Sequence, residues 1–498
     1  MGWELISQPA EIEELARLNL TAGRKAKAST AYAAAVKYLS TAINLLSGDS
    51  SGETLSDRWQ TQYDLTLEIV VEAAEAEYLN TNFPAASSLV EMVLQHGKTL
   101  LDRIPAYEIE MQIHVAQYKF NDATDTGLQA LELLGYPVNL SEQDFLVELP
   151  ALEELEDYPL MTDPTQRAAM RILQASLASI FAGRPQILLP VVLTQLKLCI
   201  EGGNSPLASS AYAWYGMLLC GALGNIDTGY QAGRLALQLL DAREHKAVTY
   251  NMFYSFIQHW KEPVRESLSP LAEGVQSGLE SGNNEYAGYC AINYCFYNFL
   301  VGENLETVKQ DQVKYRDLLL KLKQEHSLCL SQIWHQLLLN LLGKAANPLE
   351  LIGESFDESV MLPHLIAENN YYALFIAYLA KTMLFYVLEE SNRAVDSAAN
   401  AAKYSSAGAG AEYFVTLHLY QSLALLANYA NVSLSERSHY LSQVAANQEK
   451  MQLWMQHAPM NYEHKYHLVE AEKGRCIIKY EFKVLSHAMS SLWFYSYP

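Results

Sequence analysis

Residues 14–39 have the sequence ELARLNLTAGRKAKASTAYAAAVKYL, and this stretch decides the fold that we expect. Gly23, Ala35 and Leu39 lie within it and Ala42 follows it, so that the steps between these residues are 12, 4 and 3. A small residue late in one helix lets a second helix approach closely. Small residues seven positions apart on the second helix let a further unit stack against it. The stretch therefore predicts two packed helices joined by a short turn.

The same steps recur three more times along the chain, at Ala74, Ala86, Val90 and Val93, at Met111, Ala123, Gly127 and Ala130, and at Met217, Gly229, Gly233 and Ala236. Thr30, Thr81 and Gly224 occupy one offset between the paired helices. This spacing is typical of a helix–turn–helix unit of the tetratricopeptide type, and the uneven distance between units indicates a degenerate repeat. We expect an all-α fold, a right-handed α-solenoid of degenerate tetratricopeptide-like helical hairpins.

Further helix pairs are predicted without a clean register, at 245–262 with 263–281, 284–301 with 304–325, 365–388 with 391–404, and 409–430 with 434–457. Ser433 and Glu436 predict a capping box at the start of the last helix.

The composition agrees with stacked helices and excludes several classes of partner. Half of the 498 residues are apolar and 18% are charged, which is below the usual quarter. The 34 basic and 56 acidic residues give a net charge of -22. This charge repels phosphate backbones and anionic lipid surfaces, so we expect no nucleic-acid partner and no membrane partner.

The location that we expect is cytoplasmic. The six cysteines contain no CxxC pair and lie in apolar segments, as reduced core cysteines do. The N-terminus lacks the basic start and apolar core of a signal peptide. Two apolar segments, 207–226 and 371–388, need a membrane check. The first contains Gly, Ser and Asn residues and the second contains Lys381 near its centre, so buried repeat helices explain both.

One domain boundary is predicted at the acidic stretch 141–163, which holds eight acidic residues, no basic residue and two prolines. We expect a first helical array over 1–140, a linker over 141–163 and a second array over 164–475. Residues 476–498 form a divergent tail, in which SSLWFYSYP (490–498) has neither a helical pattern nor caps.

The stretch HAPMNYEHKYHLVEAEKGR (457–475) contains the histidines that need the closest inspection. The residue before Pro459 avoids the α region, and Asn461 is the expected N-cap of a new helix. On that helix His464 and His467 are three apart and Glu463 precedes the first. A zinc-protease helix needs two histidines four apart with glutamate after the first, so that motif is not met. A metal-dependent hydrolase using His457, His464 or His467 with Glu463 stays as the alternative to a structural helix.

No catalytic or cofactor motif is found elsewhere in the chain. The segments AGRKAKAST (22–30) and AGAGAE (407–412) contain glycine but lack the spacing and the preceding strand of nucleotide-binding loops. No kinase catalytic loop, DFG triplet or GxSxG elbow occurs. We therefore expect no enzyme activity, no cofactor and no metal. An interaction surface is predicted at aromatic and polar residues, namely Tyr215, His259, Trp260, Tyr294, His464 and His467.

Several stretches together resemble one family, namely GWELI (2–6), residues 14–39, DPTQRAAMRIL (163–173), GNSPLASSAYAWYG (203–216), QLLLNLLG (336–343), VMLPH (360–364) and residues 457–475. They are similar to the long helical segment of large cyanobacterial-type multidomain signalling proteins. In that family a serine/threonine kinase domain and an AAA-type ATPase lie upstream of the segment, and GAF and sensor histidine kinase domains lie downstream. The resemblance covers roughly residues 2–475, and no catalytic motif of the family matches a position here.

The resemblance implies a non-catalytic interaction and regulatory scaffold. Its partner would be a protein or peptide, or the neighbouring kinase and ATPase domains of the same system. In the family the array continues past the equivalent of Arg475, whereas this sequence departs from the pattern there. We therefore expect either a frame-broken fragment of a larger kinase or a stand-alone adaptor, and a non-functional remnant is a further alternative.

Overall fold

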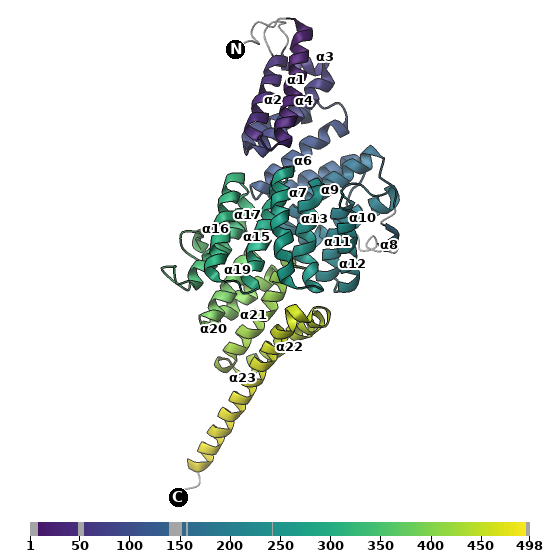
Figure 1. The fold of residues 1–498 in the computed structure, drawn as a ribbon. Coiled ribbons are helices and arrows are strands. Elements are labelled where there is room, and N and C mark those ends of the chain that lie inside the picture. The colour runs from purple at the N-terminus through teal and green to yellow at the C-terminus, as the bar shows by residue number, and fades with distance from the viewer. Residues whose placement is uncertain (1–7, 48–53, 139–151, 156–157, 242, 495–498) are drawn as a thin grey trace.

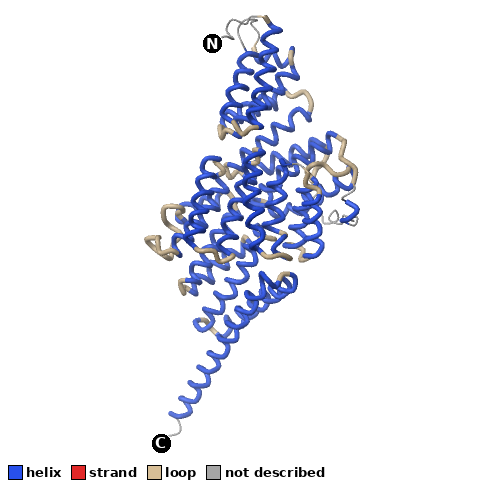
Figure 2. Tube along the Cα trace, viewed as in Figure 1, coloured by secondary structure: helices blue, strands red, loops and turns tan. Residues whose placement is uncertain are grey.

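The computed structural model describes residues 8–47, 54–138, 152–155, 158–241 and 243–494, with side chains described as far as Ile478 (Figure 1). The described residues form helices and loops without any strand (Figure 2). Two isolated β-bridges join Leu160 with Asn204 and Ile352 with Asp357. The all-α prediction is therefore confirmed for this part of the chain.

An N-terminal bundle lies at one end of the molecule (Figure 1) and comprises α1 (Pro9–Ala28), α2 (Tyr32–Ser47), α3 (Leu55–Thr61), α4 (Tyr63–Leu79) and α5 (Phe83–His96). Within it α1 packs on α2, α2 on α4 and α4 on α5. A capping box formed by Thr54 and Asp57 starts α3, where the two residues satisfy backbone donors that the first helical turn leaves free.

The central body comprises α6 (Leu100–Ala116), α7 (Phe120–Leu134), α8 (Leu152–Leu155), α9 (Pro164–Gly183), α10 (Leu188–Gly202), α11 (Ala208–Gly221), α12 (Ile226–Gln238), α13 (Arg243–Phe256), α14 (Leu268–Ser281), α15 (Asn284–Leu300), α16 (Leu305–Leu322), α17 (Glu325–Leu341), α18 (Glu358–Ala367), α19 (Tyr371–Val387), α20 (Ser391–Lys403) and α21 (Glu412–Asn428). Short 3-10 helices occur as η3 (Pro185–Ile187), η4 (Gln258–Trp260), η5 (Val264–Ser267), η6 (Ser405–Gly408) and η7 (Tyr429–Asn431). The C-terminal pair is α22 (Leu434–His457) and α23 (Pro459–Phe494).

Alternate helices form a continuous inner row. Each of α11, α13, α15, α17, α19 and α21 contacts the next member of this row, and α21 contacts α23. Contacts of α9 with α19 and of α6 with α17 show that earlier helices lie against later members of this row, so the chain curls back on itself. Helices of the inner row are covered on more than one face, which explains the apolar segment 371–388 as the buried helix α19. None of the helices in the described part of the chain combines the length and apolarity that a membrane span requires.

The four helix pairs predicted from the repeated spacing are present, and their turns share one backbone conformation. All four residue sets from the sequence lie on consecutive packed helices, namely α1–α2, α4–α5, α6–α7 and α11–α12. The predicted turn residues Thr30, Thr81 and Gly224 have φ angles of 57°, 61° and 69°, and Tyr118 at the same offset has 65°. A left-handed residue lets the chain reverse tightly between two helices.

The hydrophobic core divides at α6. One face of α6 belongs to the N-terminal cluster through Ala106, Ile109 and Ile113. Its other face joins the main cluster through Ile104 and Met111. The predicted linker is described only at 152–155 and 158–163, so most of it lies outside the described residues. The helices on either side of it, α7 and α9, pack against each other.

Two local predictions about the C-terminal region are wrong. Helix α23 begins at Pro459, so Asn461 lies inside the helix and is not its N-cap. The backbone of α23 continues as one helix to Phe494, past the point where the sequence predicts the helical pattern to end (Figure 1). The capping box of Ser433 and Glu436 at the start of α22 is confirmed.

Candidate functional site

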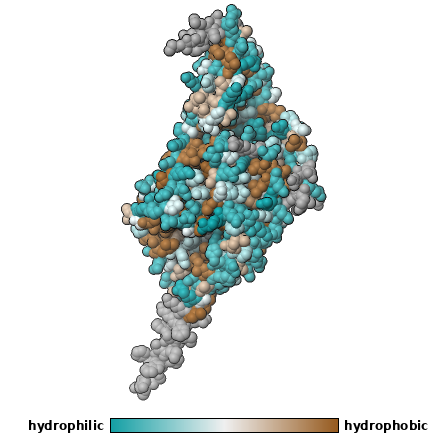
Figure 3. Space-filling model, viewed as in Figure 1, coloured by the Kyte–Doolittle hydropathy of each residue, from teal (hydrophilic) through white to brown (hydrophobic). Residues whose placement is uncertain are grey.

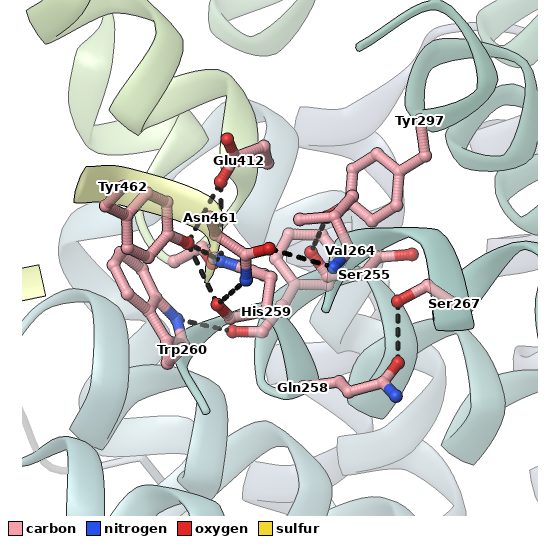
Figure 4. A network of polar contacts seen from close by, with 12 residues as sticks. Ser255, Gln258, His259, Trp260, Val264, Ser267, Tyr297, Glu412, Asn461 and Tyr462 are labelled. Atoms are coloured by element: carbon pink, nitrogen blue, oxygen red, sulfur yellow. Dashed lines mark hydrogen bonds and ion pairs between the residues drawn. The ribbon is translucent and has the colours of Figure 1, made fainter. Parts of the chain in front are cut away.

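A buried polar junction fastens the start of α23 to the central body (Figure 4). Its centre is His259 of η4, whose Nε2 lies 2.9 Å from the carbonyl oxygen of Gly410. Because a carbonyl oxygen only accepts, Nε2 carries the proton and Nδ1 is an acceptor. The hydroxyl of Tyr462 donates to this Nδ1 over 2.6 Å. Complete burial lowers the pKa of His259 to about 4, so the ring is neutral at physiological pH.

A buried ion pair completes the junction. The carboxylate of Glu412, at the start of α21, is 1% exposed and contacts the ammonium of Lys465 on α23. The same carboxylate lies 3.1 Å from the Tyr462 hydroxyl. Burial, followed by the nearby charge of Glu412, raises the pKa of Tyr462 well above its ordinary value. The phenol therefore stays protonated, and its one hydroxyl proton lies between two acceptors, Nδ1 of His259 and the carboxylate of Glu412.

The side chain of Asn461 forms hydrogen bonds with the backbone between η4 and η5. Its amide nitrogen donates to the carbonyl oxygens of His259 and Glu262, each at 2.7 Å. Its amide oxygen accepts from the backbone N–H of Val264 at 3.1 Å. One side chain of α23 thus satisfies three backbone groups that no regular element pairs, which explains why Asn461 is buried.

The prediction that His259 and Trp260 belong to an exposed interaction surface is wrong. Their exposed fractions are 0% and 1%. Trp260 packs with Trp454 and Tyr462, at ring-centroid distances of 5.6 and 5.9 Å, and its indole N–H donates to the Phe256 carbonyl over 2.9 Å. These aromatic partners come from α22 and α23, about 200 residues further along the chain, so no local pattern revealed the burial.

The other predicted surface residues lie on three different helices. Tyr215 on α11 and Tyr294 on α15 are partly buried against the main core, and Tyr294 donates to Asp311 over 3.3 Å. His464 and His467 are exposed on α23. The surface seen in Figure 3 is mostly hydrophilic with scattered apolar patches, so it shows no single dominant apolar face.

The histidines of 457–475 do not gather around a common point. His457 lies 3.7 Å from Asp227 of α12, whereas His467 lies 4.0 Å from Glu463 on α23 itself. Within the ranges that the structure describes, no group of three or more His, Cys, Asp or Glu residues could hold a metal ion. The geometry therefore gives no support to the alternative of a metal-dependent hydrolase.

A second site is a cavity enclosed by the curled inner row, which the sequence did not predict. About 40 Å³ of it is open to the centres of water-sized molecules, and it is lined from six helices, α9, α11, α13, α15, α17 and α19. Aromatic rings dominate the lining. Phe181 is the hub, with its ring centroid 5.8 Å from Trp214, 5.8 Å from Phe256 and 5.4 Å from Tyr372. A space of this size has room for a few water molecules.

Polar groups in the cavity wall fall into two sets. Asn293 and Asn251 are already paired, since the Asn293 amide donates to the Asn251 oxygen over 3.0 Å and Tyr413 donates to the Asn293 oxygen over 2.8 Å. The second set is the buried hydroxyl of Tyr286, which interacts with the side chains of Trp214 and Gln174. In the sequence, only the high content of 32 tyrosine residues pointed to such a cavity. Composition does not show which rings come together.

Comparison with known proteins gives one distant similarity. The chain is 23% identical over 350 residues to "Hybrid signal transduction histidine kinase G" of Dictyostelium discoideum, and the match covers 63% of this chain and 10% of that protein. No protein-family model matches the chain. The chain spans about a tenth of the length of this relative, and the similarity indicates a signalling-related role for the all-helical segment.

Proposed function

We propose that the chain is a non-catalytic regulatory scaffold, a right-handed solenoid of tetratricopeptide-like hairpins that belongs to a multidomain signalling kinase system in the cytoplasm. The observation that carries the proposal is the similarity to a hybrid signal transduction histidine kinase over 350 residues. The row of inner helices, each in contact with the next, supports a scaffold because such an array passes small rotations from one hairpin to its neighbour.

The partner in this proposal is a kinase or ATPase domain of the same system, or a peptide segment of one. The buried junction of His259, Glu412 and Tyr462 couples α23 to the central body. Because α23 projects from the end of the array (Figure 1), a change in hairpin packing would move it as a lever. The proposal thus gives the array a sensing role and gives α23 an output role.

The proposal is tested with the full chain and separately purified kinase and ATPase domains encoded in the same locus. Binding is measured by calorimetry, and autophosphorylation and ATP hydrolysis are measured with and without the chain. We expect binding and a changed rate in at least one domain, and weaker coupling with Lys465→Met, which breaks the junction. Lys473→Met on the same helix is the matched control. An absence of binding together with unchanged rates would contradict the proposal.

The alternative of a metal-dependent hydrolase has its own test. Elemental analysis of the purified chain would detect stoichiometric zinc, manganese or iron if the histidines of 457–475 held a metal. We expect none of these metals in the scaffold.

A further inference from the structure

We infer that the contact between the N-terminal bundle and the central body is a hinge, which closes while the Glu285 carboxyl is protonated and loosens when it is ionised. The inference goes beyond the proposed scaffold function, and measurements on the isolated chain test it whether or not the array contacts a kinase. Three observations carry it, namely the way the two parts meet, the position of Glu285 and the charges around it.

The two parts meet largely through turns. Helices α4 and α5 pack on α6, and the further contacts join the ends of helix pairs that are distant in sequence. The Tyr32 hydroxyl, at the start of α2, donates to the carbonyl of Leu279, near the end of α14, over 3.4 Å. The Lys323 ammonium, which follows α16, donates to the carbonyl of Thr81 over 3.0 Å. A contact made of such groups opens at a lower free energy than a shared core.

Glu285 faces the bundle across this contact. It lies in the first turn of α15, three residues after Gly282, where an added Cβ would lie 3.2 Å from the Leu79 side chain of the bundle. Oε1 of Glu285 is buried, and the charge of its carboxylate acts on the hydroxyl of Tyr78 on α4. The same hydroxyl interacts with the side chain of Gln324, which precedes α17. The carboxyl and the bundle therefore share one buried polar cluster.

Hydroxyl groups surround this carboxyl. Burial raises the pKa of Glu285 to about 7, and the Tyr289 side chain acts to lower it. Burial also raises the pKa of Tyr78, Tyr286 and Tyr289, so these phenols stay protonated. The positive end of the α15 dipole favours the ionised form. The raised pKa shows that burial outweighs this dipole.

The bundle brings a second carboxylate to the contact. The charge of Glu75, on α4, acts on the hydroxyl of Tyr78 as that of Glu285 does, and it acts on Tyr32 of α2 as well. The ammonium of Lys27 pairs with Glu75 at 2.6 Å. This lysine is thus engaged within the bundle, and ionisation of Glu285 adds a like charge opposite Glu75.

The central body leaves the Glu285 charge uncompensated, as far as its residues are described. The Lys323 ammonium already binds a backbone carbonyl of the bundle. His326 of α17 is neutral because burial lowers its pKa to about 3, and burial also lowers the pKa of His245 on α13. Glu280 of α14 accepts a hydrogen bond from its own helix and is an acid itself. Ionised Glu285 is therefore more stable in water than in the closed contact.

Protonation and closure are linked. When the bundle separates, water reaches Glu285 and its pKa returns from about 7 towards the ordinary 4.5. The closed form binds the proton more tightly, so closure is fully favoured below about pH 4.5 and weakens as the pH rises to about 7. Between pH 6 and pH 8 the ratio of open to closed chains should rise about tenfold.

Hydrogen exchange of the full 498-residue chain tests the hinge. Exchange is followed by mass spectrometry at pH 6 and pH 8 and corrected for the intrinsic rate. Peptides over 76–82 and 279–286 report on the contact, and peptides of α19 report on global unfolding. We expect a larger opening constant at the contact than in α19, and a tenfold rise of that constant with pH. A constant that does not change with pH, or that equals the constant of α19, would overturn the inference.

Variants assign the effect to one carboxyl. Glu285→Gln and Glu285→Ala are neutral at every pH, so the opening constant of the contact should be the same at pH 6 and pH 8. The alanine variant decides the matter if the glutamine variant fails to fold. Glu325→Gln is the matched control, because Glu325 lies next to Gln324 in the first turn of α17 and is exposed. It should keep the tenfold rise. The same rise in a Glu285 variant as in the wild type would overturn the assignment.

Discussion

Glu412 keeps a carboxylate inside the molecule, and Lys465 reaches it from a helix 53 positions further along the chain. Removing one partner of a buried pair leaves an uncompensated charge. We predict that Lys465→Met lowers the free energy of unfolding by about 3–5 kcal/mol, as measured by urea denaturation. Lys473→Met should change it by less than about 1 kcal/mol, since the Lys473–Glu470 pair is about one-third exposed. Equal effects of the two variants would argue against a buried ion pair.

Buried histidines make stability depend on pH. Desolvation lowers the pKa of His326 from 6.5 to about 3 and that of His418 to about 4. A base whose pKa is lowered on folding binds its proton more readily in the unfolded chain, so its contribution is fully present above pH 6.5 and is lost as the pH falls towards the folded pKa.

We therefore predict that the free energy of unfolding falls between about pH 6.5 and pH 4. At about pH 5 the loss due to His326 is about 2 kcal/mol. His326→Gln should flatten this slope, and His439→Gln, at an exposed position of α22, should leave it unchanged. Urea denaturation at several pH values measures both slopes. The same slope in wild type and His326→Gln would contradict the prediction.

At the scale of helices, close approach depends on glycine where two backbones meet. A Cβ added at Gly216 of α11 would lie 2.6 Å from the carbonyl oxygen of Gly229 on α12. Because backbone cannot move aside as a flexible side chain can, we predict that Gly216→Ala destabilises the chain by about 1–3 kcal/mol.

Gly474 on α23 is the matched control, since a Cβ there meets no atom within 4 Å. Gly474→Ala should stabilise the helix by about 0.5–1 kcal/mol. Thermal unfolding of the two variants compares them directly. Shifts of the same sign would contradict the argument from helix approach.

The turns between paired helices store strain at non-glycine residues. Thr81 has φ 61° between α4 and α5, and a left-handed conformation costs a residue with a Cβ about 1–2 kcal/mol. We predict that Thr81→Gly raises the free energy of unfolding by about 0.5–1 kcal/mol. Thr41→Gly, inside helix α2, should lower it by about 0.5 kcal/mol. Guanidinium denaturation of both variants tests whether the sign follows the turn conformation.

At the scale of the whole molecule, the N-terminal bundle has its own core. The apolar residues of α1 and α2 belong to a cluster that includes residues of α4 but none of the central body. Hydrogen bonds between the N-terminal bundle and the central body include one from the Tyr32 hydroxyl to the Leu279 carbonyl at 3.4 Å and one from the Lys323 ammonium to the Thr81 carbonyl at 3.0 Å. Regions with separate cores open as separate cooperative units.

We predict that amides of α1 and α2 exchange with solvent at a lower free energy of opening than amides of α15 and α19. Native-state hydrogen exchange at increasing guanidinium concentration measures the opening energy of each helix. A single opening energy shared by all helices would show that the array unfolds as one unit.

The sequence by itself determined the helices, the paired units and their turns, because these depend on residues close together in the chain. The 12, 4 and 3 steps from Gly23 to Ala42 placed the contact between α1 and α2, and the offset of Thr30 and Thr81 placed the turns. The capping box at Ser433 needed only a glutamate three residues later. Such patterns depend on helical periodicity, which is a local property.

Only the tertiary structure decided which helix faces pack against one another. His259 looked exposed because the groups that bury it, Gly410 and Tyr462, lie 151 and 203 positions away. The aromatic cavity likewise needs side chains from α9 to α19, which come together when the inner row curls. Periodicity shows that a helix has an apolar face, but a helix apolar on several sides has more than one possible partner. The curvature of the array selects among these partners, and it results from the packing of all the helices together.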